Sequence, residues 1–435
     1  MTANCIDLFS GCGGLSLGLG SAGFKTRFAV EAHDDAFATY EKNLLHRHPE
    51  RHDWPSWLER RAWRAEELFS EHKTELKALR GSVDLIAGGP PCQGFTTNGL
   101  RRPDDPRSRM VDVYLNFVRE VRPCLVLLEN VQGFRSMPHG TGGTYEDYVR
   151  GQLVEAGYDV WSDVLRAMDW GVPQRRPRFV LIAAKAGALT GIDPFLRLRV
   201  ARQKFLQVRN LGPGPTSAQD AISDLETNGD EMPLDEEWGH LGFKRLQRKA
   251  SSSSSFQKLM RVESHDQPTD LRLPRHRQPA IQRMKDILST CERGVCLRRD
   301  DRERLGIGKR STTPLDPNAP APTISTLPDD FVHYGAPRSM TVREHARLQS
   351  FPDWFSFQGP YTSGGKQRRN ASPRFTQVGN AVPPLLAEAI GEVMLGLLPI
   401  IRDNDVSHFS EGVNMLCKGL PQNGEIHDGD IVATL

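Results

Sequence analysis

Short apolar runs separated by segments with helical spacing dominate the first 184 residues of the chain. Six of these runs have the length and apolar content of buried strands. The predicted strands are 4–9, 26–30, 83–87, 124–128, 160–165 and 179–184, and the clearest predicted helices between them are 34–45, 68–79, 110–121 and 145–156. Strands that alternate with helices indicate an α/β fold, a largely parallel sheet with helices on both of its faces.

This alternation stops after residue 184 and returns near residue 322. The interval holds Gly-Pro repeats at 212–215 and a serine run at 251–255, which are typical of an irregular region with a flexible insert. Beyond it, Thr341 and Glu344 have the spacing of a helix capping box, and a last helix is predicted from 377 to about 397. We therefore expect a first domain that is discontinuous in sequence. The predicted division is 1–184 completed by 365–400, a second domain at 185–364, and a tail at 401–435.

Composition places the chain among soluble globular proteins. It is 38% hydrophobic and 25% charged, and no apolar run is long enough to cross a bilayer. The start of the chain lacks the pattern of a secretory signal, and seven thinly spread cysteines suit a reducing compartment. Cys291 and Cys296 lie close together but have no second pair of ligands at metal spacing, so no metal is expected.

Charge is distributed unevenly along the chain. The net charge is only +2, but residues 241–310 hold 18 Lys and Arg against 8 Asp and Glu. A basic segment within a nearly neutral protein favours a polyanionic partner. A solvated surface of charged residues is the simpler alternative, and charge alone leaves the two open.

The first predicted strand leads through the glycine-rich turn 10–18 into a helix, and the next strand ends at Glu31. A strand, a glycine-rich turn, a helix, a strand and an acidic residue form the layout of a nucleotide-binding βαβ unit. In such a unit, an acid about 20 residues after the glycines binds ribose hydroxyls. The sequence therefore predicts a cofactor of the adenosine type.

Candidate catalytic side chains lie at the ends of three other predicted strands. Cys92 comes after two glycines and two prolines, at a strand end where open α/β sheets place their chemistry. Glu129 ends an all-apolar strand, where a carboxylate is costly unless it is used or paired. Gln174, Arg176 and Arg178 alternate at the start of the last strand and so share one face, suited to an anion or a carboxylate. Taken alone, Cys92 would be interpreted as a buried structural cysteine in a turn.

In their order along the chain, these blocks resemble the cytosine-C5 DNA methyltransferases. The matching blocks are DLFSGCGGLSLG, Glu31, GGPPCQGF, ENV, QRRPR, RxxTxRExARLQxFP and QVGNAVPP, and they cover most of residues 4–184 and 322–398. The resemblance implies a Rossmann-like sheet typical of S-adenosylmethionine-dependent methyltransferases, with helices on both faces. It also implies that 185–364 is a smaller, irregular target-recognition domain with a hinge.

The resemblance further implies roles for individual residues. Cys92 would attack C6 of the cytosine, Glu129 would bind its N3 edge, and Arg176, Arg178 and Gln174 would support them. Contacts to S-adenosylmethionine would come from Phe9, Gly11, Gly13, Gly14, Glu31, Pro90, Asn380, Ala381 and Val382. Cys12 would be structural. An acid near Glu66 or Glu67 would contact the adenine, and the sequence leaves open which one.

The implied partner is double-stranded DNA, from which the target cytosine must be flipped before it can be attacked. We expect a monomeric enzyme of the bacterial cytoplasm, of the restriction–modification kind, without membrane contact. A cognate endonuclease would not form a stable complex with it. Two alternatives remain, a transfer RNA methyltransferase of the same family and a catalytically silent DNA-binding protein. The long basic region favours duplex DNA, and intact Cys92, Glu129 and Arg176 argue against silence.

Overall fold

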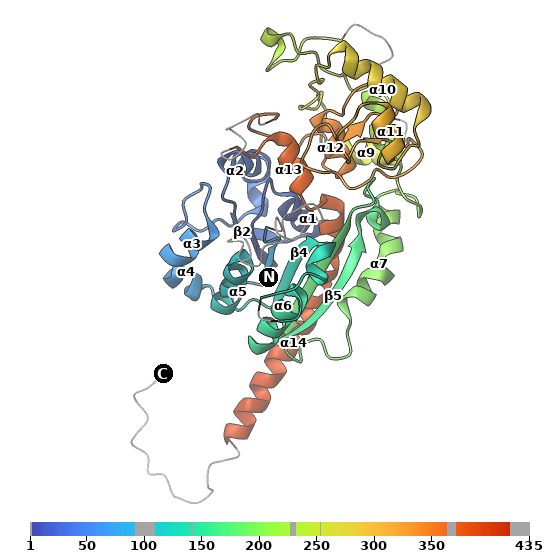
Figure 1. Cartoon of the computed structure of the whole chain (residues 1–435). Coiled ribbons are helices and arrows are strands. Elements are labelled where there is room, and N and C mark those ends of the chain that lie inside the picture. The colour runs from blue at the N-terminus through green and yellow to red at the C-terminus, as the bar shows by residue number, and fades with distance from the viewer. Residues whose placement is uncertain are drawn as a thin grey trace, which may run out of the picture.

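A single six-stranded sheet forms the centre of the molecule, with its strands in the order β2-β1-β3-β4-β6-β5 (Figure 1). The computed structural model describes residues 2–91, 109–140, 142–226, 232–252, 254–362 and 371–417, with the backbone alone after residue 403. The strands are β1 (Asn4–Leu8), β2 (Lys25–Val30), β3 (Leu85–Gly88), β4 (Leu125–Val131), β5 (Tyr158–Arg166) and β6 (Pro177–Lys185). The α/β prediction and all six predicted strands are confirmed.

The order of the strands predicts a crevice at the carboxyl ends of the parallel strands, between β1 and β3. β2, β1, β3 and β4 are parallel, whereas β6 runs antiparallel to both of its neighbours. β2, the next strand along the chain, lies on one side of β1. β3, which follows later in the chain, lies on the other side. Loops that follow β1 and β3 therefore diverge, which is where open α/β sheets bind their ligands.

Side chains of the central strands alternate between two apolar layers. Leu125 and Leu127 pack with one set of helices, and Val126 and Leu128 pack with another on the opposite face. The first layer is covered by α1 (Gly14–Ala22), α7 (Pro194–Val208) and α14 (Pro384–Cys417). The second is covered by α3 (Ala65–Glu71), α4 (Lys73–Ala78), α5 (Arg109–Val121) and α6 (Tyr145–Glu155). The sheet is thus covered on both faces, as predicted.

The last helix packs along the first, although α1 ends at Ala22 and α14 begins only at Pro384. A Cβ added at Gly18 of α1 would lie 2.4 Å from Ala387 Cβ and 2.5 Å from Pro384 O. Only glycine permits this approach. The close contact holds α14 against α1, the helix that follows the glycine-rich turn. The range Arg374–Asp403 is long and apolar enough to cross a membrane, but most of its apolar part is buried in the fold. The apolar part of α14 is therefore packed in the core. α14 continues to Cys417, beyond the predicted end at 397, and its buried apolar residues reach Ile401.

Two predicted helices are interrupted. The predicted helix 34–45 consists of α2 (Asp34–Tyr40) followed by a π turn, η1 (Glu41–Leu45), and the predicted helix 68–79 is divided into α3 and α4 at His72. The segment 46–64, for which no helix or strand is predicted, contains the 3₁₀ turn η2 (Pro49–Arg51) and places Trp63 in the core. Its tryptophans bury apolar surface without a periodic pattern, so periodicity could not detect their packing.

The remaining helices form a second group at the other end of the molecule (Figure 1). They are α8 (Ala218–Ile222), α9 (Ser255–Met260), α10 (Gln278–Thr290), α11 (Arg299–Arg304), α12 (Val342–Leu348) and α13 (Arg374–Asn380), with a small sheet of β7 (Thr313–Pro314) and β8 (Phe331–Val332). Short 3₁₀ turns are η4 (Gln132–Arg135), η5 (Ala167–Trp170), η6 (Ser223–Leu225) and η7 (Gly239–Leu241). α7 lies beyond the predicted domain boundary at residue 184, yet it packs against α14 and β5. The division of the chain into domains stays a prediction.

The predicted capping box at the start of α12 is confirmed. Thr341 Oγ1 accepts a hydrogen bond from the Glu344 amide, and the Glu344 carboxylate accepts one from the Thr341 amide. Glu344 is fully buried, and its two ion-paired hydrogen bonds with Arg338 help to hold its pKa at about 2 despite the burial. Arg347, also fully buried, bonds to Asp224 and Asp353. α12 is therefore joined to η6 through paired charges in the interior.

Candidate active site

Glu129 and Arg178 form an ion pair at the edge of the sheet. Glu129 faces Val180 across the β4–β6 ladder and Val131 faces Arg178, so Glu129 and Arg178 are diagonal neighbours on one face. Arg178 Nε lies 2.8 Å from Glu129 Oε1, and the two side chains are only 9% and 12% exposed. Burial raises the pKa of Glu129, while the positive charges of Arg178 and Arg176 oppose this rise. Glu129 can therefore stay protonated at a higher pH than an ordinary glutamate side chain does.

β4 extends beyond the predicted strand 124–128 and continues through Glu129 and Asn130 to Val131. The cause is the ladder with β6, which extends through the pair of Val131 and Arg178. Asn130 consequently points to the opposite side from Glu129, and its Nδ2 donates a hydrogen bond to Pro90 O at 2.9 Å. The strand that carries the carboxylate thereby also fixes the proline turn.

The turn after β3 brings the chain against Glu129. A Cβ added at Gly89 would lie 3.1 Å from Glu129 Oε2, so the backbone passes beside the carboxylate. Pro90 is buried, in a turn of restricted backbone freedom. Cys92 and the arginine-rich segment that follows it, 92–108, lie outside the described residues. The geometry thus places the residues immediately before Cys92 at the Glu129 carboxylate.

Gln174 and Arg176 bind the backbone of later segments. Arg176 is 2% exposed, and its guanidinium donates to the carbonyls of Ile324, Gly379 and Ala381 at 2.8–3.1 Å. Gln174 is fully buried, and its amide bonds to Leu348 O, Gln349 Oε1 and the Ile324 amide. Of the three alternating side chains predicted to share a face, Arg178 pairs with Glu129, while these two fasten the last blocks of the chain to the start of β6.

The glycine-rich turn after β1 has a conformation that leaves room for a ligand. Phe9 adopts a left-handed backbone with φ 60°, which is uncommon for a residue with a side chain and is concentrated at functional sites. Gly11 has φ 56°, and a Cβ added there would meet nothing within 4 Å. Ser10 Oγ is buried and has no hydrogen-bond partner among the described residues. A buried hydroxyl without a partner beside open backbone is the expected surrounding of a polar ligand.

Glu31 closes this turn from the end of β2. Its carboxylate accepts hydrogen bonds from the amides of Gly11 at 3.0 Å and His33 at 2.8 Å. Burial raises the pKa of Glu31, and these amides oppose the rise. The predicted pairing of the turn with the acid of the second strand is therefore present in space as well as in sequence.

The last block of the chain contacts the same turn. A Cβ added at Gly14 would lie 2.4 Å from Val382 O and 3.4 Å from Ala381 Cβ. Gly13 precedes it with φ 97°, and Asn380 is exposed at the end of α13. The cofactor residues predicted from the first and last blocks thus lie together. Pro90, which comes from another block, is hydrogen-bonded to Asn130, the neighbour of Glu129.

Gly14→Ala is expected to lower both the melting temperature and the affinity for the cofactor. The added methyl group overlaps Val382 O and must displace backbone, at a cost of about 1–3 kcal/mol. Differential scanning fluorimetry checks the stability, with Gly20→Ala in the same helix as a control. There, the nearest atom is Arg51 Cδ at 3.6 Å, so the stability should be unchanged or higher. Equal melting temperatures of Gly14→Ala and wild type would contradict the close contact.

These residues fit an adenosine-type cofactor. The fit rests on the open backbone at Gly11, the buried Ser10 hydroxyl and the Glu31 carboxylate, which suit a ligand with amino, carboxylate and ribose groups. Cys12 is 1% exposed, and burial raises its pKa to about 12, in keeping with the predicted structural role. Among the described residues, no cluster of His, Cys, Asp or Glu is arranged to hold a metal ion.

The acid expected near the adenine stays unassigned. The Trp63 amide donates to Glu31 O at 2.8 Å, which brings this segment close to the cofactor turn. Glu67 forms an ion pair with Arg61 at 2.9 Å, and the Arg61 guanidinium lies 3.3 Å from the centre of the Trp63 ring. Glu66 is exposed.

Sequence reasoning missed two residues of the site, Ser10 and Asn130. Both lie inside motifs that it identified, next to the residues chosen. For Asn130 a signal existed, because alternation along a strand places the neighbour of Glu129 on the opposite side, toward the preceding strand end. For Ser10 there was none, since nothing in the sequence shows that a hydroxyl is buried without a partner.

A family model described as C-5 cytosine-specific DNA methylase matches residues 3–396 of the chain. Among curated relatives, the type II methyltransferase M.DdeI of Desulfomicrobium norvegicum is 30% identical over 93% of this chain and 92% of its own length. The type II methyltransferase M.AgeI of Thalassovita gelatinovora is 31% identical, over 89% of this chain and 98% of its own.

A solved structure with the same architecture is an Escherichia coli protein described as a DNA modification methyltransferase encoded within a prophage. It is 25% identical, has a TM-score of 0.59, and the alignment covers 92% of this chain and all of that one. The similarity therefore extends over both groups of elements and is not confined to the sheet.

Proposed function

Because the chain belongs to the C-5 cytosine-specific DNA methylase family, we propose that it methylates C5 of a cytosine flipped out of duplex DNA, with S-adenosylmethionine as the methyl donor. Its relatives are type II methyltransferases of the restriction–modification kind. We propose that it acts as a monomer in the bacterial cytoplasm, protecting one short sequence.

Cys92 is the proposed nucleophile. C5 of cytosine is too electron-poor to take a methyl group directly, so the Cys92 thiolate first forms a bond to C6. The electron pair of the C5–C6 double bond moves toward C5, which becomes a nucleophilic enamine carbon. After methyl transfer, the C5 proton is removed and the Cys92–C6 bond breaks, so the thiolate and the aromatic ring are both regenerated.

Glu129 is the proposed group at N3. Attack on C6 places negative charge on the ring, and a proton held at N3 neutralises it. The raised pKa of Glu129 favours the protonated form that this step needs, and Arg178 fixes the orientation of the carboxyl group through the 2.8 Å ion pair. Arg176 and Gln174 act as positioning residues, because they hold Ile324, Gly379 and Ala381 at the edge of the site.

The glycine-rich turn is the proposed cofactor site. S-adenosylmethionine supplies a methyl group on a sulfonium centre, which releases a neutral thioether. Glu31 would bind the ribose hydroxyls, Phe9 would lie against the adenine, and the backbone of Gly11, Gly13 and Gly14 would surround the methionine part. Asn380, Ala381, Val382 and Pro90 would complete the site from the other loops.

The single observation that carries the proposal is the position of Glu129. Its carboxylate lies beside the turn three residues before Cys92, and β4 ends at the same edge of the sheet as β1 and β2, which carry the Glu31 turn. A transfer assay tests the proposed substrate. Tritiated methyl groups from S-adenosylmethionine should appear in plasmid DNA and not in bulk transfer RNA. Transfer confined to the RNA would contradict the proposed substrate.

Glu31→Gln is expected to weaken S-adenosylmethionine binding by about ten- to a hundredfold. A hydrogen bond to a charged group contributes about 1.5–3 kcal/mol, and the amide also disturbs the contacts with Gly11 and His33. Isothermal titration calorimetry measures this without any need for catalysis. Glu71→Gln, an exposed change in α3, serves as the control and should bind as wild type does. Unaltered affinity in Glu31→Gln would remove Glu31 from the cofactor site.

A further inference from the structure

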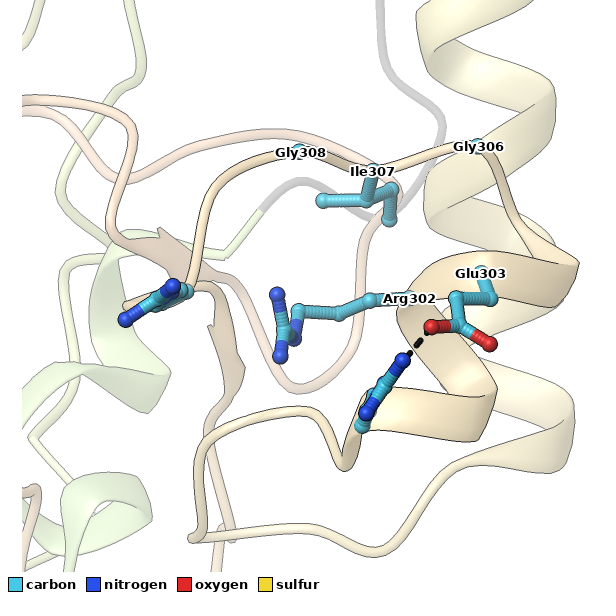
Figure 2. A pocket seen from close by; sticks show the side chains of 7 residues that line it. Arg302, Glu303, Gly306, Ile307 and Gly308 are labelled. Atoms are coloured by element: carbon cyan, nitrogen blue, oxygen red, sulfur yellow. Dashed lines mark hydrogen bonds and ion pairs between the residues drawn. The ribbon is translucent and has the colours of Figure 1, made fainter.

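A basic pocket lies in the second group of elements, away from the crevice (Figure 2). It encloses about 650 Å³ and is lined by the end of α11 and the turn that follows, namely Arg299, Arg302, Glu303, Gly306, Ile307, Gly308 and Arg310. Figure 2 shows the Arg302 side chain extending into the space below the turn of Gly306 and Gly308. A Cβ added at either glycine would meet nothing within 4 Å, so a ligand can approach the backbone closely.

Two of the three arginines that line this pocket differ from their neighbours in how they are paired. Residues 298–310 contain six basic side chains, and four of them form ion pairs with carboxylates. These pairs are Arg298–Glu292, Arg299–Glu303, Arg304–Asp301 and Lys309 with Asp329 and Asp330, at 2.5–2.8 Å. The other two, Arg302 and Arg310, have no carboxylate partner in the part of the chain that the structure describes, and both line the pocket.

Arg302 is also incompletely hydrogen-bonded inside the protein. Its Nε is buried and has no acceptor among the described residues. A buried donor without a partner is costly, so an acceptor supplied by a ligand would bring a gain in free energy. Two guanidinium groups without counter-ions beside an open glycine turn suit a phosphate, which accepts paired hydrogen bonds from arginine.

A short series of contacts joins the pocket to the candidate active site. Lys309 pairs with Asp330 at 2.7 Å, and Asp330 accepts a hydrogen bond from Ser325. Ser325 O would lie 2.3 Å from a Cβ added at Gly379, whose carbonyl accepts from Arg176. These contacts fix the turn that carries the pocket to the segment that Arg176 binds.

We propose that Arg302 and Arg310 bind phosphate groups of the DNA backbone and so position the duplex on the second group of elements. The proposal rests on the function proposed above and adds to it the residues that bind the backbone. A base edge carries no net charge, whereas each phosphodiester carries one negative charge and so complements one guanidinium group that has no carboxylate partner among the described residues. These residues should therefore contribute affinity at every sequence and should not select the methylated site.

The salt dependence of binding tests this proposal directly. The probe is a fluorescein-labelled pool of random-sequence 30-base-pair duplexes, and fluorescence anisotropy gives the affinity between 50 and 200 mM NaCl. Removal of one phosphate-binding side chain should reduce the slope of log K against log salt by about 0.9 and weaken binding about fivefold at 150 mM salt. We expect this of Arg302→Gln and Arg310→Gln separately, and about twice the reduction in slope in the double variant.

Arg304→Gln is the matched control, because Arg304 lies on the same helix and carries the same charge but is outside the pocket. It should leave the slope unchanged, and Arg310→Lys should retain most of it. The proposal is overturned if Arg304→Gln reduces the slope as much as Arg302→Gln. It is overturned equally if the pocket variants keep the slope but change the methylated sequence, which would indicate base contacts.

Methyl transfer by the wild-type protein to plasmid DNA is measured in the same preparations. Where transfer is present, an unchanged slope in both pocket variants overturns only the role of the two arginines in phosphate binding. Where the wild type neither transfers methyl groups nor binds the duplexes, the proposed function itself fails, and the proposed phosphate binding fails with it.

Discussion

Cys92→Ala is expected to abolish methyl transfer while DNA and cofactor binding persist. Without the thiolate no bond forms at C6, and C5 does not become nucleophilic. Removal of a catalytic nucleophile lowers turnover by about 10⁶-fold in a well-studied protease, so the activity should fall below detection. Incorporation of tritiated methyl groups into plasmid DNA measures the loss, and calorimetry with S-adenosylmethionine verifies that the cofactor site is intact.

Cys296→Ala provides a matched cysteine control for this experiment. Cys296 is exposed and lies in the second group of elements, so its replacement should leave transfer unchanged. Residual transfer by Cys92→Ala at the wild-type rate would exclude the covalent mechanism. A protein that only binds DNA would show no transfer in the wild type either.

Glu129→Gln is expected to lower kcat by about 10²–10⁴-fold, the usual contribution of a positioned general acid. The amide keeps the shape of the side chain but cannot deliver a proton to N3. Single-turnover transfer assays measure the effect, and S-adenosylmethionine affinity should stay the same. Glu155→Gln, an exposed change on α6, is the control and should be as active as wild type. Unaltered turnover of Glu129→Gln would refute the role assigned to Glu129.

The pH dependence of transfer gives a second check of the same residue. Burial raises the pKa of Glu129, so the protonated, active form is retained below that pKa and disappears as the pH rises through it. Wild-type kcat/KM should therefore fall on the alkaline side, and this fall should be absent from Glu129→Gln. Arg178→Gln should move the fall to higher pH, because the Arg178 charge lowers the pKa of Glu129.

The centre of the sheet could be predicted because β3, β4 and β6 are largely apolar. The run Leu125–Leu128 is buried on both faces of the sheet. A short, continuous apolar run of this kind is typical of a strand in a sheet that helices cover on both faces. The end of β4 could not be predicted, since it depends on the ladder with β6, whose hydrogen bonds draw Glu129 and Asn130 into the strand. Local sequence carries no information about such a partner.

The candidate site divides in the same way. The Glu31 turn combines residues close in sequence with a known spacing, and the Glu31 carboxylate accepts a hydrogen bond from the Gly11 amide. Gln174 and Arg176 were predicted beside Arg178 from alternation alone, but their partners are segments about 150–200 residues away. Alternation along a strand predicts only the side of the strand to which a side chain points. Tertiary packing then decides which carboxylate or carbonyl a long side chain reaches.

The basic region shows the same limit on a larger scale. Composition indicated a polyanion partner somewhere within 241–310, but 18 basic residues are not equivalent. Only their pairing in space separates Arg302 and Arg310 from neighbours such as Arg304 that are neutralised by carboxylates. This distinction depends on side-chain distances, and a count of charges cannot supply it.

Bisulfite sequencing of DNA from a methylation-free bacterial host that expresses this chain examines the proposed activity and its sequence specificity together. We expect protected cytosines at one position of a single short sequence, and no protection in a host that expresses Cys92→Ala. Soluble wild-type protein with no protected cytosine anywhere in the genome would contradict the proposal that the chain methylates cytosine in duplex DNA.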